Sequence, residues 1–113
     1  DLQIRGASFY GPIPFRAPRG MQFIHVAKVL KTLGRPHVGA SVIGRDWDDH
    51  TSPEIIAKRL IRGANPGAIL SLHDGDDAAL TSDRSATVTA LANVLKDLAG
   101  EYRFVTIDHL LSL

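Results

Sequence analysis

His73 is the residue of this sequence best suited to proton transfer. It ends an apolar run, "AILSLH" (68–73), and Asp74 and Gly75 follow it directly. Imidazole titrates near neutral pH even in an unperturbed environment, so a histidine at the end of a strand can act as a general acid or base. The alternative is a histidine that only hydrogen-bonds a loop, because histidine is intermediate in its preference for burial.

Polar side chains also follow two other apolar runs. Asp46 and Trp47 come after "HVGASVIG", and Arg16 lies near the end of "IPFRAP". In parallel α/β proteins, catalytic groups collect at the carboxyl ends of the strands. We therefore expect Arg16, Asp46 and His73 to converge at one edge of a sheet, with Asp46 close to His73. For Trp47 the alternative is simple packing in the core.

The segment "FRAPRG" (15–20) predicts a rigid turn at the end of a strand, because proline and glycine favour turns. The backbone N–H that follows Pro18 belongs to Arg19, and in such a turn it could point toward a ligand. The alternative is a turn that only exposes Arg16 and Arg19 to solvent.

The segment 44–54, "GRDWDDHTSPE", is rich in acidic residues but lacks the pattern of a calcium loop. The alternating acidic positions and the central glycine of such a loop are missing. We interpret Asp48, Asp49 and His50 as a solvated loop before a helix, whose N-terminus favours acidic residues. The charged segment 73–85 is interpreted in the same way, as a solvated connection.

Hydrophobic periodicity predicts helices that alternate with strands. The helices are expected near 21–33, 52–64 and 85–99, and the strands at 13–18, 37–44, 68–73 and 102–107. This alternation predicts an α/β fold with a parallel sheet and right-handed crossovers, in which the helices lie outside the strands.

The helical segments also predict caps and an apolar face. Thr51 and Glu54 have the spacing of a capping box at the start of the second helix, and Ser82 or Ser85 is expected to cap the third. The third helix carries apolar residues at helical spacing on one face: Val88, Leu91, Ala92, Leu95 and Leu98.

The composition limits the classes of function. The 113 residues correspond to one domain or a piece of one. With 13 basic and 12 acidic residues the net charge is +1, which gives no argument for binding nucleic acid or an anionic membrane surface. The chain has no cysteine, which excludes disulfides and thiolate metal sites, and no apolar run approaches the roughly 20 residues of a membrane span.

Because the chain begins at Asp1 and its only methionine is Met21, we expect part of the native protein to lie upstream.

Four stretches, in this order, resemble the polysaccharide deacetylase family, the NodB-homology carbohydrate esterases. They are "FRAPRG", "DWDDHTSPEIIAKRL", "PGAILSLHDG" and "TVTALANVLKDLAGEYRFVTIDHLL". The first is similar to the arginine–proline motif of the family, the second to its Asp–Trp segment and the third to its terminal Leu–His–Asp motif. The last resembles the closing helix and strand. The resemblance covers nearly the whole chain from residue 13 onward.

The resemblance implies a metal-dependent hydrolase that removes acetyl groups from N- or O-acetylated polysaccharides or oligosaccharides such as peptidoglycan or chitin. In the family a divalent cation, often zinc, polarises the acetyl carbonyl and activates water, and an aspartate is the base. By motif, His73 would protonate the leaving group and Asp46 would tune His73. Arg16 would pair with the base aspartate, the backbone N–H of Arg19 would stabilise the oxyanion, and Trp47 would form a wall of the sugar groove.

The chain also departs from the family. Ser71 stands where many members place a leucine that lines the acetyl pocket. The Asp–Asp motif of the first strand and the metal-binding His-x-x-x-His are missing, because no two histidines are four residues apart: His25, His37, His50, His73 and His109. A zinc site needs about three protein ligands and an open position. We therefore expect the metal to be bound mainly by residues that this chain lacks.

These departures predict that residues 1–113 are the C-terminal portion of a single deacetylase domain. The expected fold is the parallel-strand half of a distorted (β/α) TIM-like barrel, incomplete without an N-terminal half that is a separate chain or a cleaved segment. Alone, this portion is expected to be inactive. The alternative is a non-catalytic, deacetylase-like domain that binds glycan or a protein partner. The resemblance favours a periplasmic, cell-surface or secreted location, and a cytoplasmic one stays open.

Overall fold

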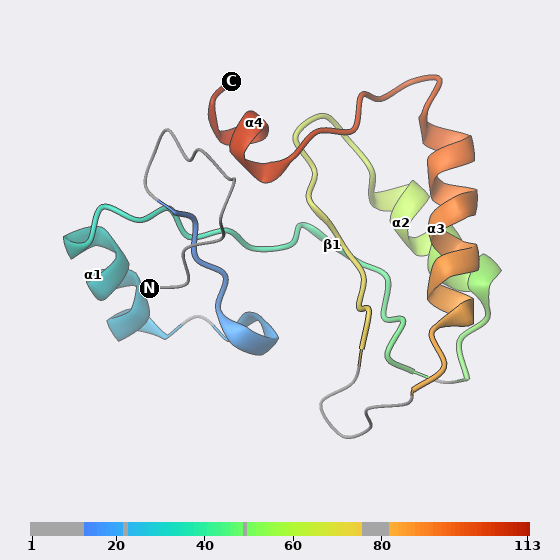
Figure 1. Ribbon diagram of the computed structural model, residues 1–113, viewed down its shortest axis with the longest axis horizontal. Coiled ribbons are helices and arrows are strands. Elements are labelled where there is room, and N and C mark those ends of the chain that lie inside the picture. The colour runs from blue at the N-terminus through green and yellow to red at the C-terminus, as the bar shows by residue number, and fades with distance from the viewer. Residues whose placement is uncertain (1–12, 22, 49, 76–81) are drawn as a thin grey trace, which may run out of the picture. The chain divides into compact units, whose positions relative to one another are not determined.

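The computed structural model describes residues 13–21, 23–48, 50–75 and 82–113 (Figure 1). The chain divides into two compact units, Asp1–Gly39 and Ala40–Leu113. In the described residues no helix has the length and apolar character needed to cross a membrane.

The first unit contains a 3-10 turn, η1 (Pro18–Gly20), and one helix, α1 (Ile24–Thr32). The expected strand at 13–18 is reduced to a single parallel bridge between Phe15 and His37. In this bridge the Phe15 N–H donates to the Pro36 carbonyl at 2.8 Å, and the Val38 N–H donates to the Phe15 carbonyl at 2.8 Å. The direction of the pairing is parallel, as the sequence predicts.

The second unit is a strand–helix–strand arrangement followed by a second helix. The strands β1 (Val42–Ile43) and β2 (Leu70–Ser71) are parallel, with Val42 opposite Leu70 and Ile43 opposite Ser71. Helix α2 (Pro53–Gly63) connects them, and α3 (Ser85–Leu98) follows β2. Figure 1 shows α2 and α3 side by side, and α2 also contacts β1.

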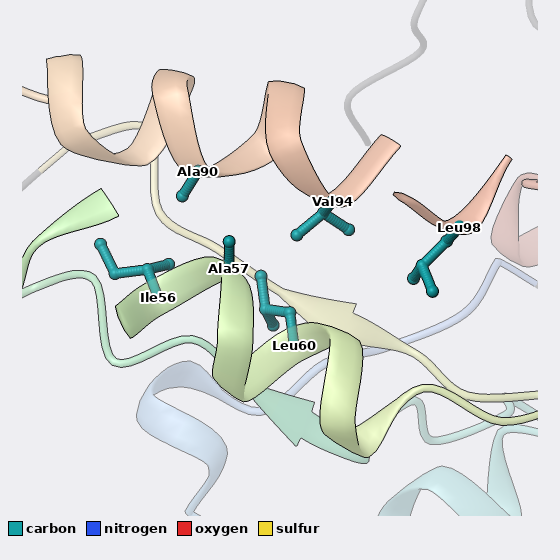
Figure 2. Close-up of a cluster of buried hydrophobic side chains, with 6 residues drawn as sticks. All are labelled: Ile56, Ala57, Leu60, Ala90, Val94 and Leu98. Atoms are coloured by element: carbon teal, nitrogen blue, oxygen red, sulfur yellow. The ribbon is translucent and has the colours of Figure 1, made fainter. Parts of the chain in front are cut away.

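The core of this unit lies between α2 and α3 (Figure 2). Three residues come from each helix: Ile56, Ala57 and Leu60, and Ala90, Val94 and Leu98. Ile56 and Leu60 are fully buried and Val94 is 1% exposed. Burying one such aliphatic side chain stabilises the fold by about 1.5–3 kcal/mol relative to exposing it. Val42, Leu70 and Leu72, in and next to the strands, pack against this cluster, so it fixes the strands beneath the helices.

Two glycines allow the strands to approach α2 closely. A Cβ at Gly63 would lie 2.6 Å from Cγ1 of Val42, and a Cβ at Gly44 would lie 2.9 Å from Cδ2 of Leu72. Both distances are shorter than real Cβ contacts, so neither position accepts a side chain without a shift of its neighbours. Gly44 therefore determines how closely the end of β1 lies against β2.

The apolar face that the sequence shows on α3 is not the face that meets α2. The buried residues are Thr87, Ala90, Val94 and Leu98, whereas four of the five residues named from the sequence are exposed: Val88 by 66%, Leu91 by 42%, Leu95 by 41%, and Ala92. The helix is apolar on more than one face, so the periodicity alone could not decide which face meets α2.

Both predicted caps also differ from the structure. The N-cap of α2 is Ser52, whose hydroxyl accepts the Ile55 N–H at 3.4 Å, and Thr51 is instead buried. The N-cap of α3 is Arg84, without a capping side chain, and Asp83 accepts the Ser85 N–H at 2.8 Å. The cap of α2 is therefore one residue later than predicted, whereas α3 begins at Ser85 as predicted and its first N–H is accepted by Asp83, not by a serine.

The prediction of a strand at 102–107 is wrong for the described structure. The segment runs without strand pairing into α4 (Ile107–Leu111), whose N-cap Thr106 accepts the His109 N–H at 3.3 Å. A strand needs a hydrogen-bonded neighbour, and the described sheet has two strands, β1 and β2. The described residues thus form part of the expected parallel α/β architecture, without a closed barrel.

An apolar groove of about 770 Å³ runs along the second unit between α3 and the C-terminal segment. Its lining includes Leu91 and Leu95 of α3, then Phe104 and Val105, and Leu110 of α4. Phe104 is 47% exposed, so aromatic and aliphatic surface remains uncovered along this groove.

Candidate catalytic site

The structure places Asp46 directly beside His73. Oδ1 of Asp46 lies 2.8 Å from Nδ1 of His73, and the backbone N–H of His73 donates to Oδ2 of Asp46 at 2.7 Å. The side chain of Asp46 is completely buried, whereas that of His73 is 40% exposed. The pair therefore consists of an enclosed carboxylate and an imidazole that solvent can reach.

The two strands bring these residues together. Ile43 and Ser71 are opposite each other at the carboxyl ends of parallel neighbours, so the segments that follow leave the same edge of the sheet. After Gly44 the chain turns at Arg45, whose φ of 57° lies in the left-handed region that non-glycine residues seldom adopt. Arg59 of α2 holds this turn, because its Nη1 donates to the Gly44 carbonyl at 3.2 Å.

Two residues at the start of α3 complete the surroundings of Asp46. The Thr87 hydroxyl donates to Oδ2 of Asp46 at 3.0 Å. The guanidinium of Arg84 donates through Nη1 to the Asp46 carbonyl and through Nη2 to the Gly75 carbonyl, both at 3.1 Å. Sequence reasoning missed both residues. The available signal was a hydroxyl at Thr87 on a helical face shared with Ala90 and Val94.

The hydrogen bonds keep Asp46 ionised. Burial raises the pKa of this carboxyl, but the bonds from the ring and backbone of His73 and from Thr87 together lower it below its ordinary value. An ionised carboxylate can only accept hydrogen bonds. Nδ1 of His73 therefore carries a proton and donates a hydrogen bond to Oδ1. The second ring nitrogen, Nε2, is then the atom available for proton transfer.

Trp47 stands beside the imidazole. The centres of the Trp47 and His73 rings are 5.3 Å apart and the ring planes meet at 89°, the edge-on arrangement that aromatic pairs favour. Trp47 is 47% exposed, so packing in the core is not its role. Ser71, at the end of β2, is buried with 3% exposure. Its predicted place in the lining of an acetyl pocket stays a prediction.

Arg16 and Arg19 belong to the first unit, and both are exposed. The predicted turn is present: the Gly20 N–H donates to the Ala17 carbonyl at 3.1 Å, and Arg19 has a φ of 55°. The predicted convergence of Arg16 with His73 stays a prediction, as does the oxyanion role of the Arg19 N–H.

The described residues do not fit a resident metal ion. They contain no group of three or more His, Asp or Glu side chains that could hold one. The oxygens of Asp46 are occupied by His73 and Thr87, and Nδ1 of His73 is occupied by Asp46. In the loop 44–54, Asp48 and His50 are exposed and Asp48 accepts the His50 N–H at 3.1 Å, as in a solvated loop. Asp49 lies outside the described residues.

This arrangement has the geometry that general acid or base catalysis requires. A buried carboxylate fixes the orientation and tautomer of an exposed imidazole and stabilises the imidazolium when the ring takes up a proton, as in histidine–aspartate pairs of hydrolases.

The sequence is similar to those of curated deacetylases. It is 39% identical over 103 residues to a peptidoglycan-N-acetylglucosamine deacetylase of Bacillus cereus, which covers 88% of this chain and 46% of that protein. It is 35% identical over 81 residues to a chitooligosaccharide deacetylase of Azorhizobium caulinodans, which covers 69% of this chain and 38% of that protein. No protein-family model matches the chain.

The fold is similar to that of a solved CE4 family protein. This structure is a mutant of a pseudoenzyme with restored enzymatic activity, and it matches 88% of this chain and 33% of its own, with a TM-score of 0.71 and 26% identity. The chain therefore spans about half the length, or less, of the curated relatives and of the structure that it matches. These similarities confirm the family resemblance found in the sequence.

Proposed function

Because this chain belongs to the polysaccharide deacetylase (NodB-homology) family, we propose that it contributes the acid side of the active site in a hydrolase that removes acetyl groups from N-acetylated glycans. The observation that carries the proposal is the pair of buried Asp46 and exposed His73 at the edge of the sheet. The deacetylases similar to this chain are named for peptidoglycan and for chitin oligosaccharides, which gives the substrate class.

In the proposed reaction His73 protonates the leaving group. Water adds to the acetyl carbon while the base aspartate, outside this chain, would take up its proton, and the bond from that carbon to the sugar nitrogen breaks, which releases acetate. The amine needs a proton as it leaves, and the Nε2–H of the His73 imidazolium supplies it. Asp46 stabilises this imidazolium through Nδ1, at the 2.8 Å separation seen in the structure. The exposed indole of Trp47, next to the imidazole, would form a wall against which a sugar ring can lie.

The remaining roles follow the family pattern. Arg16 would hold the base aspartate ionised, and the backbone N–H of Arg19 would stabilise the oxyanion. Ser71 would contribute a small polar group near the acetyl pocket. The metal, with zinc as the first choice, would be held mainly by residues outside this chain, because the chain lacks the Asp–Asp and His-x-x-x-His motifs of the family.

The groove of the second unit supports a complementary half of the domain. Leu91 and Leu95 of α3 are exposed by 42% and 41% and line this groove together with Phe104. Contiguous apolar surface of this kind is typical of a site that a partner covers, which supports the proposal. We propose that an N-terminal half of the deacetylase domain covers it and carries the aspartates and histidines that bind the metal. Alone, residues 1–113 would then be inactive.

The proposal is tested by measuring acetate released from N-acetylglucosamine oligomers and from peptidoglycan. The complete protein that carries this chain is expected to release acetate, and residues 1–113 alone are expected to release none. Acetate release that stops when zinc is chelated supports the metal dependence, and zinc binding by the complete protein but not by residues 1–113 alone supports the placement of the metal in the complement.

A second candidate function is non-catalytic binding of glycan. The solved relative favours it, because that protein is a CE4 family pseudoenzyme whose activity was restored by mutation. Glycan binding by the complete protein without release of acetate, at saturating metal, would favour this second function over the first.

A further inference from the structure

The two carboxylate oxygens of Asp46 have different partners. Oδ1 meets the ring of His73, whereas Oδ2 accepts two hydrogen bonds, from the His73 backbone at 2.7 Å and from the Thr87 hydroxyl at 3.0 Å. The backbone donor is fixed by β2 and the hydroxyl donor is fixed by α3. Together they hold the plane of the carboxylate, a group whose terminal torsion is otherwise broad.

Thr87 does not make the hydrogen bond that is usual for a threonine inside a helix. Such a hydroxyl normally bonds the carbonyl four residues earlier, as Thr89 does with the Ser85 carbonyl at 2.9 Å. Thr87 donates instead to Asp46 and is buried, with 7% exposure, on the face that also carries Ala90 and Val94. Burying a hydroxyl in this apolar environment without a hydrogen-bond partner would destabilise the fold. The orientation of the Thr87 hydroxyl toward Asp46 is therefore well determined.

Arg84 connects the two loops that carry the pair. Its guanidinium fork donates to the Asp46 carbonyl and to the Gly75 carbonyl, one in each loop, at 3.1 Å each. The planar fork of arginine reaches two acceptors in fixed directions, which lysine cannot do. Because Arg84 is also the N-cap of α3, the start of this helix is tied to both sides of the site.

We propose that Thr87 is a positioning residue, which sets the tautomer of His73 by fixing the carboxylate of Asp46, and that Arg84 supports it by holding the two loops together. This inference rests on the proposed deacetylase function for its effect on catalysis, but the tautomer can be measured without any activity. With Thr87 in place, Oδ1 faces Nδ1 and the proton stays on Nδ1. Without its hydroxyl, the carboxylate can rotate, and the tautomer with the proton on Nε2 gains population.

The test uses ¹⁵N NMR of His73 in the complete protein, at a pH where the ring is neutral. The wild-type protein is expected to show a proton on Nδ1. Thr87→Val, which replaces the hydroxyl by a methyl group of similar size, is expected to give a mixture of tautomers, and Thr87→Ser is expected to restore the wild-type spectrum. Thr89→Val is the matched control on the same helix, where the spectrum of His73 is expected to stay unchanged.

Kinetics provide the second measurement. If acetate is released, Thr87→Val should lower kcat by about tenfold with KM unchanged, as expected for loss of one hydrogen bond to a charged group. Thr87→Ser should recover most of that loss, and Arg84→Lys should lower kcat without such recovery. Thr87→Ala is the second variant in case the valine variant does not fold.

An Nε2–H tautomer in the wild-type protein, or an unchanged Nδ1–H tautomer in either folded variant that lacks the hydroxyl, would overturn the inference. A protein that releases no acetate but shows the expected shift of tautomer would overturn the proposed function and leave the positioning role of Thr87 supported.

Discussion

The two apolar faces of α3 have opposite environments. One face carries Ala90 and Val94, which are buried against α2, and the other carries Val88, Leu91 and Leu95, which are exposed. Both faces are apolar in sequence, yet the described chain supplies a partner for only one of them. This difference shows that α3 carries more apolar surface than the described residues cover, and that the face with Thr87 also supports the candidate site.

The largest expected effect comes from a comparison of two valines on different faces of this helix. Val94→Ala should lower the free energy of unfolding by about 2–3 kcal/mol, because Val94 is 1% exposed and its removal leaves a cavity between α2 and α3. Val88→Ala is the matched control, since Val88 is 66% exposed, and should change stability by less than about 0.5 kcal/mol. Urea unfolding measures both, and equal losses would contradict the assignment of the faces.

Overpacking on the buried side should have the next largest effect. Gly63→Ala would place a Cβ 2.6 Å from Val42 and should destabilise the second unit by about 1–2 kcal/mol. Gly100→Ala is the control, because a Cβ at that position meets nothing within 4 Å. If thermal unfolding shows the two variants to be equally stable, α2 does not lie as close to β1 as the structure shows.

Substitutions on the exposed face of α3 should lower stability only when the complementary N-terminal half is present. In residues 1–113 alone, Leu91→Ser combined with Leu95→Ser should change stability by less than about 0.5 kcal/mol per site. In the complete protein the same two substitutions should lower the free energy of unfolding by more than about 2 kcal/mol, because both side chains would be covered. Similar small effects in the two forms would argue against a partner on this groove.

The smallest effect concerns pH. The pKa of Asp46 is lower in the folded state than in the unfolded state. Ionised Asp46 therefore contributes its full stabilisation at pH values above the unfolded pKa of about 4. This stabilisation is lost as the pH falls from there through the lower pKa of the folded state. The unfolding free energy of the wild-type protein should therefore fall more steeply below pH 4 than that of Asp46→Asn. Parallel curves for the two proteins would contradict the hydrogen-bonded environment of Asp46.

Much of the arrangement could be predicted from local patterns. The three helices lie close to their predicted ranges, because apolar periodicity and proline and glycine signals are local. The proximity of Asp46 and His73 follows from a rule about parallel strands, and the structure shows it directly. Thr87 and Arg84 were missed because their roles depend on which side of α3 meets the strands, which is a tertiary property. The expected strand at 102–107 failed because pairing needs a neighbour in space.

The most direct measurement of the central claim is the turnover of the complete protein after His73→Ala, with His50→Ala as the control in an exposed loop. Loss of the general acid should lower kcat for deacetylation of N-acetylglucosamine oligomers by about 10²–10⁴-fold, while His50→Ala should keep nearly full activity. Near-normal turnover in folded His73→Ala would contradict the assignment of His73 as the proton donor.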